Sequence, residues 1–313
     1  MVPPLVIMGL NIIPLAAYAA DVTEVPTDIE ATITAQLYVD GETVTASDVS
    51  YEASGTDNSG VYAKNGATVT LTNITVTSKS NSSTYDDFPL DASGEYGTNS
   101  GVLANGATIT LNGGSITTSG LIANGAFATA GGTINISGTA DDPFVITVTG
   151  YNSHGVDVTD GGTITLSYAN ISTSGEHASG IATDALGGDA ASSITADHRT
   201  ITTTGEYSSA AYADSNGTIT VTNSTLTALQ DVGACVAASG VMYLTNCDVT
   251  GANAALKVYC PNQAQAGTAV IDGGSLTATA GDAILFSCDT GSVTVQNGTT
   301  ITAYRGAGGC NKF

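Results

Sequence analysis

The sequence predicts an all-β protein, a right-handed parallel β-helix (solenoid) of about nine coils with three short strands in each coil. Three observations lead to this prediction: one short theme recurs along the chain, polar and apolar residues alternate within each copy, and a further short strand precedes many copies at a fixed distance. Internal repeats at intervals of roughly 20 to 50 residues indicate a repeat architecture before any single motif does.

The recurring theme is a threonine-rich segment, as in NGATVTLTNITVTS (Asn65 to Ser78) and NGTITVTNSTLTA (Asn216 to Ala228). Each copy has one residue, usually aliphatic, at the centre of its first strand, and we use these positions as anchors: Val69, Ile109, Ile134, Ile164, Ile194, Ile219, Met242, Ala269 and Val293. Successive anchors lie 23 to 40 residues apart, with a mean of 28. Propeller blades need about 40 residues or more, so the spacing favours the coils of a solenoid.

Each copy begins with a first strand, in which Val69 and Leu71 alternate with threonines, as expected for a strand with one buried face. A second strand follows at once, around Ile74 and Val76. A third strand lies upstream, eight residues before the anchor in five copies, as from Val61 to Val69. Asn-Gly and Gly-Gly pairs mark the corners between strands.

The composition fits stacked coils that bury aliphatic columns and expose threonine, with 38 glycines, no tryptophan and 11% charged residues. We divide the chain into an apolar segment resembling an export signal (residues 1–20), an irregular N-terminal coil or cap (residues 21–58) and the β-helix (residues 59–313). The irregular coil would use ATITAQLYV (Ala31 to Val39) and GETVTA (Gly41 to Ala46).

The pairing of segments such as SGVYA (Ser59 to Ala63) with segments such as NGTITVTNSTLTA resembles the secreted, adhesin-like β-helix proteins, which share their shape with the pectate-lyase-like superfamily. The resemblance covers about residues 60–303. It implies an extracellular, surface-exposed role and carries no catalytic motif.

Residues 1–20 contain an apolar run from Leu5 to Ala20 that ends in Ala17-Tyr18-Ala19, a small-x-small pattern typical of a cleavage site. The run is short of the ~20 residues that span a bilayer and contains Pro14, so we expect no membrane span. The alternative is an apolar strand that joins subunits.

The net charge is −22, and the chain has six basic residues. Phosphate and anionic membrane surfaces are bound by clustered Lys and Arg, so nucleic acid is not an expected partner. The sequence indicates no cofactor and no metal motif. The expected partners are a surface glycan, a protein receptor or copies of the chain itself.

The five cysteines lie between Cys235 and Cys310. Cys260 and Cys288 end similar strands of successive coils, so stacking would bring them within disulfide range. We predict this disulfide for an exported protein, with two stacked free thiols as the alternative. Cys235, Cys247 and Cys310 then leave an odd thiol.

Two residue groups are candidates for catalysis of the polysaccharide lyase or hydrolase type found on β-helices. Asp197, His198 and Arg199 form an acid, His and base cluster, although an exposed corner ion pair is the simpler interpretation. Asp141-Asp142 with His154 weakly resembles a hydrolase arrangement but lacks the flanking clamp residues. Overall the sequence favours a noncatalytic protein.

Two surfaces are candidates for binding. An outward column on the third strands would expose Tyr62, Leu103 and Phe127 on neighbouring coils, with Tyr212 further along, and exposed apolar patches often mark interfaces. Paired threonine rows, such as Thr68 and Thr70, resemble an ice-binding face, although threonine is also common at exposed β positions.

The sequence therefore predicts a noncatalytic extracellular or cell-surface rod, adhesin-like, that presents a repetitive binding face. A self-assembling filament subunit, joined end to end or through residues 1–20, is the first alternative. A polysaccharide-active enzyme is the second, and ice binding is a minor one.

Overall fold

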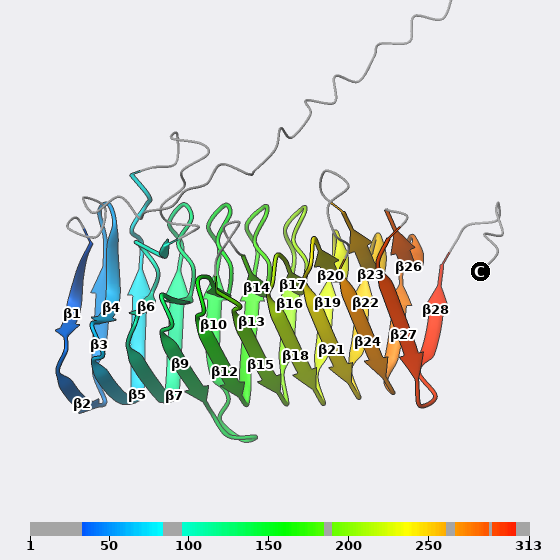
Figure 1. Ribbon diagram of the computed structural model, residues 1–313. Helices are drawn as coiled ribbons and strands as arrows, with labels where there is room; N and C mark the ends of the chain where they lie inside the picture. Colours follow the sequence, from blue (N-terminus) through cyan, green and yellow to red (C-terminus); the bar gives the residue numbers. More distant parts are fainter. Residues whose placement is uncertain (1–32, 84–95, 185–189, 261–266, 288–289, 305–313) are drawn as a thin grey trace, which may run out of the picture.

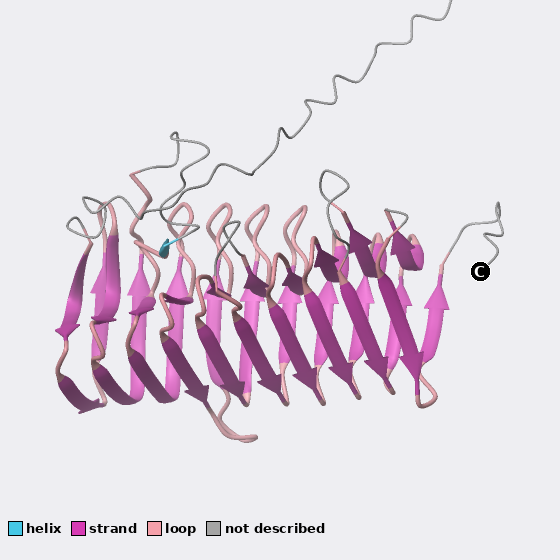
Figure 2. Ribbon diagram, in the orientation of Figure 1, coloured by secondary structure: helices cyan, strands magenta, loops and turns pink. Residues whose placement is uncertain are grey.

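The computed structural model describes residues 33–83, 96–184, 190–260, 267–287 and 290–304. Within them the protein is an all-β parallel β-helix, as the sequence predicts (Figures 1 and 2). Every pairing between named strands is parallel, and each strand between the first and last described coils pairs with strands of the coils before and after it. Residues 1–32, which include the signal-like segment, lie outside the described residues.

The third strands of the coils form one ten-stranded sheet, which we call sheet 1. Its strands, in spatial and chain order, are β1 (Thr34–Asp40), β4 (Asn58–Lys64), β6 (Val102–Asn105), β8 (Ala126–Thr129), β11 (Val156–Val158), β14 (Ile181–Thr183), β17 (Ala211–Ala213), β20 (Val232–Ala237), β23 (Ala254–Tyr259) and β26 (Asp282–Phe286).

The first and second strands form an 18-stranded sheet, which we call sheet 2, and the long strands β5 and β7 contribute to both of its rows. The first row is β2 (Thr43–Ser47), β5 (Thr68–Ser78), β7 (Thr108–Thr118), β9 (Thr133–Ser137), β12 (Thr163–Ser167), β15 (Ser193–Asp197), β18 (Thr218–Thr222), β21 (Val241–Thr245), β24 (Thr268–Asp272) and β27 (Ser292–Gln296). The second row adds β3 (Ser50–Ala53), β10 (Phe144–Val148), β13 (Ala169–Thr173), β16 (Thr200–Thr203), β19 (Thr225–Ala228), β22 (Asp248–Gly251), β25 (Ser275–Ala278) and β28 (Thr300–Ala303).

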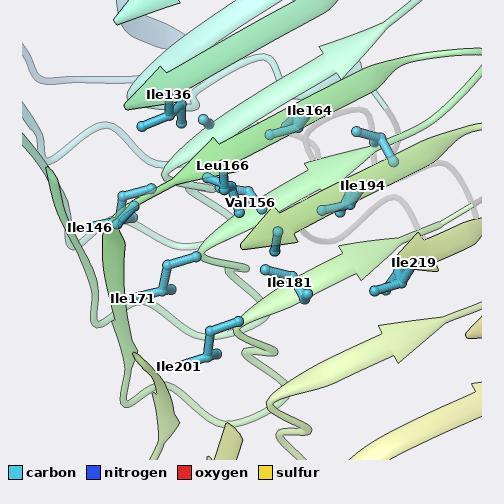
Figure 3. Close-up of a cluster of buried hydrophobic side chains, with 14 of the residues drawn as sticks. Ile136, Ile146, Val156, Ile164, Leu166, Ile171, Ile181, Ile194, Ile201 and Ile219 are labelled. Atoms are coloured by element: carbon cyan, nitrogen blue, oxygen red, sulfur yellow. The ribbon is translucent and has the colours of Figure 1, made fainter. Parts of the chain in front are cut away.

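The anchor column is confirmed along its whole length. All nine predicted anchors pair in register from one coil to the next, beginning with Val69 opposite Ile109 and ending with Ala269 opposite Val293. The anchors from Val69 to Ala269 are fully buried. Figure 3 shows part of this interior, where Ile164, Ile194 and Ile219 follow one another on successive coils. Each coil therefore buries its aliphatic side chains against its two neighbours, and these contacts stabilise the rod.

The corners of the coils use asparagine in the left-handed backbone conformation, as in Asn65, Asn73 and Asn223 (φ 55°, 52° and 49°). Asparagine tolerates this conformation better than most residues. At one corner of β7 the chain needs glycine, because a Cβ on Gly114 (φ 115°) would lie 2.0 Å from the carbonyl oxygen of Ile74 on the preceding coil.

The first described coil, formed by β1, β2 and β3, stacks on the next coil in register: Val44 lies opposite Val69, and Tyr51 lies opposite Val76. The described parts of ATITAQLYV and GETVTA thus form coil strands, β1 and β2, in this structure. In the described part of the chain, no helix is both long and apolar enough to cross a membrane.

Candidate binding face

The predicted column Tyr62, Leu103 and Phe127 does stack on neighbouring coils, since Tyr62 pairs with Leu103 and Leu103 pairs with Phe127. Its predicted exposure is wrong: all three side chains are fully buried. With Ile33 they form a hydrophobic cluster separate from the interior of the rod. The outer face of sheet 1 is therefore covered at this end of the molecule.

Gly97, which lies outside the repeat, and Tyr38, on the first described coil, provide part of this cover. Gly97 packs on Phe127 so closely that a Cβ there would lie 2.4 Å from the ring carbon Cγ. Tyr38, on the first coil, meets the ring of Tyr62 edge to face at 5.4 Å. The period-2 pattern assigns these side chains to the outer face correctly, but alternation alone does not tell which outer faces are exposed to solvent.

Tyr212 is half-buried, and its hydroxyl donates a hydrogen bond to Asp214 Oδ2 at 3.1 Å. It packs at the edge of another small cluster that contains Cys235 and Val232. Tyr212 is thus well separated in sequence and in coil number from the Tyr62 cluster, and the four predicted binding residues do not form one exposed patch.

Asp197 and His198 form an exposed pair, with 2.7 Å between Asp197 Oδ2 and His198 Nδ1. The carboxylate also accepts hydrogen bonds from the Thr222 hydroxyl and the Asn223 amide. These contacts, that of Thr222 above all, lower the pKa of Asp197 to about 2. His198 stacks on Tyr168 with ring centroids 5.0 Å apart.

Arg199 does not join this exposed pair, because its side chain turns into the rod and is 3% exposed. Its guanidinium donates to the backbone oxygens of His198 and Leu166. Burial lowers its pKa to about 10. The predicted cluster is therefore split between surface and interior. Arg199 donates hydrogen bonds to backbone carbonyls at a corner position that is occupied by Ala169 on the preceding coil and by Ser224 on the next.

The weaker candidate set is also separated. Asp141 and Asp142 are exposed in the loop between β9 and β10, which projects at the bottom of Figure 1. His154 lies in the loop before β11, among the loops at the top of the same view.

Cys260 is disulfide-bonded, whereas Cys235 and Cys247 are free and buried. Cys288, the partner that the sequence predicts for Cys260, lies outside the described residues, as does Cys310. The Cys260–Cys288 pairing therefore stays a prediction.

The surface that sequence reasoning missed is a row of loops that connect sheet 2 to sheet 1 (the upper loops in Figure 1). Apolar, aromatic and histidine side chains on these loops follow one another on successive coils. We call them the loop-edge row, in which Tyr151 is half-buried and the others are exposed: Leu121, Tyr151, His177, Tyr207 and Leu229. Tyr151 meets His177 edge to face at 5.8 Å, and His177 stacks on Tyr207 at 5.0 Å with 15° between the ring planes. Tyr207 is 63% exposed and Leu229 is 58% exposed.

Hydrogen bonds between coils hold these loops in place. The backbone N–H of His177 donates to Glu206 O, and that of Asn152 donates to Glu176 O, both at 2.9 Å. Within the row, buried serine hydroxyls add further links, as where Ser208 Oγ accepts from the N–H of Ala178 at 2.9 Å. The aromatic rings are thus presented by a fixed backbone.

A sequence signal for this row exists. The segments GYNSHG, GEHASG and GEYSSA, beginning at Gly150, Gly175 and Gly205, have equal length and each carries an aromatic residue or histidine near its start. Equal loop lengths on stacked coils predict stacked side chains, but the loops are outside the strand repeat from which the coils were identified.

The threonine rows are in register, with Thr68 opposite Thr108 and Thr70 opposite Thr110. Further along, Asn135 and Tyr243 interrupt the second row. The rows form a regular outer surface of sheet 2.

No family model matches the chain, and no curated protein matches it. Among solved structures, the fold resembles a chain in the cryo-EM structure of the Vag8–C1 inhibitor complex, with a TM-score of 0.51 and 18% identity, over 87% of this chain and 66% of that one. The chain thus spans slightly less than two thirds of that structure's length. A TibC-catalysed, hyper-glycosylated fragment of TibA also matches, with a TM-score of 0.19 and 13% identity, over 85% of this chain and 100% of the fragment. The first similarity shows that the parallel β-helix fold is shared.

Proposed function

We propose that this chain is a noncatalytic extracellular or cell-surface β-helix protein that binds a protein partner through the loop-edge row. The observation that carries the proposal is the stack of the half-buried Tyr151 with the exposed His177 and Tyr207, on loops fixed by hydrogen bonds. Rigid aromatic side chains offer large contact area at a low entropic penalty, and aromatic residues are enriched in interfaces.

Three further observations support this proposal. Cys260 is disulfide-bonded, which favours an oxidising compartment such as the cell exterior. The fold is shared with Vag8, whose structure was determined in a complex with a protein, C1 inhibitor. The net charge of −22 favours a partner with a basic surface.

The test compares wild-type protein with a His177→Ala, Tyr207→Ala double variant. Each is titrated against immobilised extracellular proteins in three forms: native, deglycosylated and denatured. A Thr165→Ala, Thr195→Ala double variant on the exposed face of sheet 2 is the matched control. We expect saturable binding to a native protein that survives deglycosylation, falls at least tenfold in the loop-edge variant and persists in the control.

Binding that disappears on deglycosylation would assign the row to a glycan instead. Equal binding by both double variants, or none by wild type, would refute the loop-edge row as the binding face.

A second function, assembly into filaments, is supported by the last described coil. Ile301 on β28 continues the buried column that includes Leu276, yet Ile301 is 45% exposed. Phe286 and Val295 on the same coil are 48% and 38% exposed. An exposed interior column, beside strands that have no further partner among the described residues, is suited to pairing with another chain.

Size-exclusion chromatography followed by electron microscopy tests assembly. We expect filaments or end-to-end oligomers that Ile301→Lys abolishes and Thr302→Lys, on the opposite face of the same strand, does not. Monomers alone at all concentrations would remove this function.

A further inference from the structure

The outer face of sheet 1 contains a buried polar cluster that the binding function does not use. Asp157 lies at the centre of β11, paired with Phe127 on one side and Ala182 on the other. It belongs to the same outward column as Tyr62 and Leu103, and like them it is fully buried. An aspartate therefore occupies a position that neighbouring coils fill with apolar side chains.

The Asp157 carboxylate is only half satisfied. Its Oδ1 accepts a hydrogen bond from the backbone N–H of Val158 at 2.8 Å. Its Oδ2 is buried and has no hydrogen-bond partner among the described residues. Burying an unpaired carboxylate oxygen is costly, above all for an ionised group, so such an oxygen calls for a bound cation or a proton.

Two more groups converge on this carboxylate. Asp184 follows β14 directly, on the next coil, and its side chain is 37% exposed, which gives the cluster access to solvent. His154 lies in the loop before β11, with 3.4 Å between its Nε2 and Asp184 Oδ2. One potential ligand atom from each of His154, Asp157 and Asp184 lies within 4.8 Å of the others.

The orientation of His154 makes it a donor in this cluster. Its Nδ1 accepts a hydrogen bond from the backbone N–H of Ser179 at 3.0 Å, so the lone pair of Nδ1 is in use and the proton is on Nε2. Nε2–H points to Asp184. A metal-ligating histidine instead donates from its second ring nitrogen. His154 therefore positions the Asp184 carboxylate and leaves the two aspartates as the ligand groups.

The nearby polar groups do not neutralise these aspartates. Asp214, on the coil after Asp184, is itself acidic and already accepts hydrogen bonds from Tyr212 and Ser215. Among the described residues, no Lys or Arg forms an ion pair with Asp157 or Asp184. The contact of Asp184 Oδ2 is with His154, which is neutral while its Nδ1 accepts the hydrogen bond from Ser179.

We propose that Asp157 and Asp184 bind a divalent cation, with Ca²⁺ the best fit, and that the ion links two successive coils. Carboxylate oxygens are hard ligands, and Ca²⁺ completes its coordination with water and carbonyl oxygens in flexible geometry. Two protein carboxylates make a weak site, so we expect a Kd of about 10⁻⁴–10⁻³ M, the range of extracellular calcium modules. This inference does not depend on the loop-edge row.

The experiment follows thermal unfolding of the full chain after treatment with a chelator, with and without added CaCl₂. At a free Ca²⁺ concentration about ten times Kd, we expect the unfolding midpoint to rise by about 2–4 °C. Asp157→Asn and Asp184→Asn should each abolish that rise, while Asp141→Asn, which changes an exposed aspartate in the β9–β10 loop, should retain it.

In chelator alone, Asp157→Asn should unfold at or above the wild-type temperature, because the change removes a buried carboxylate with an unpartnered oxygen. Isothermal titration with CaCl₂ provides a readout independent of stability. Weak binding to the acidic surface is common to both proteins, so wild type should bind one more Ca²⁺ ion than Asp157→Asn.

Three results would overturn the proposal. One is the absence of a Ca²⁺-dependent shift and of binding heat in wild type. Another is an equal shift in wild type and both aspartate variants. The third is a larger shift with ZnCl₂ than with CaCl₂ that His154→Gln removes, since that would make the histidine a ligand.

Discussion

His177 and Tyr207 lie on successive coils, 30 positions apart in sequence, and their rings stack with centroids 5.0 Å apart. The hydrogen bond from the N–H of His177 to Glu206 O aligns the two loops at this level. The stack shows how a repeat converts equal loop lengths into a continuous surface, and Tyr207 within it is 63% exposed.

The stack should make a small but measurable contribution to stability. In a double-mutant cycle of His177→Ala and Tyr207→Ala, we expect a coupling free energy of about 0.5 kcal/mol, near the lower end for aromatic pairs because both rings are exposed. Urea unfolding of the four proteins measures it. A coupling of zero would mean that the rings do not interact in solution.

The interior columns should be sensitive to truncation. We expect Ile164→Ala to reduce the free energy of unfolding by about 2–5 kcal/mol, because Ile164 is fully buried between Ile134 and Ile194. The neighbouring Thr165→Ala, at an exposed position, should change it by less than about 0.5 kcal/mol. Chemical unfolding of the two variants checks this, and similar losses would contradict the assignment of inner and outer positions.

Asp197 should make stability depend on pH in the acid range. Its pKa is about 2 in the folded protein, below the ordinary value of 3.8, because it accepts a hydrogen bond from Thr222 and is further stabilised by Asn223 and His198. The carboxylate therefore stabilises the fold fully above about pH 4, and this contribution is lost as the pH falls towards 2.

Thermal midpoints measured from pH 6 to pH 2 test this for wild type and Asp197→Asn. We expect wild type to be the more stable above pH 4 and the difference to vanish near pH 2. A difference that stays constant over the range would show that the carboxylate charge is not responsible.

The free thiols should be unreactive in the folded protein. Burial raises the pKa of Cys235 to about 12 and that of Cys247 to about 11, and both side chains are less than 5% exposed. Because the thiolate is the reactive form, iodoacetamide at pH 8 should modify neither residue in native buffer and both in guanidinium chloride. Mass spectrometry of the peptides reads the outcome, and rapid native modification of either would contradict the burial.

Cys260 should be joined to Cys288. The structure has Cys260 in a disulfide, and the two residues end equivalent strands in the sequence repeat. A non-reducing peptide map should contain one linked pair with these two cysteines, which separates on reduction. A link from Cys260 to Cys310 would show that the repeat does not decide the pairing.

The sequence determined the coils of this protein. The alternation around Val69 and the recurrence of its equivalents predicted the strands, the corners and the register, and the anchor column is confirmed to Val293. This succeeded because each coil buries its side chains only against adjacent coils, so a local pattern repeated at short intervals contains the information that the stack needs.

Tertiary structure decided which outward side chains meet solvent and which groups meet each other. Phe127 is buried because Gly97 lies on it, and Gly97 is outside the repeat. Arg199 turns inward, where the backbone carbonyls of His198 and Leu166 accept hydrogen bonds from its guanidinium. Asp157 lies close to Asp184 because β11, which contains Asp157, pairs with β14, which Asp184 follows directly. Alternation assigns a side chain to a face, whereas exposure and chemistry depend on what packs over that face, and that is set by segments distant in sequence.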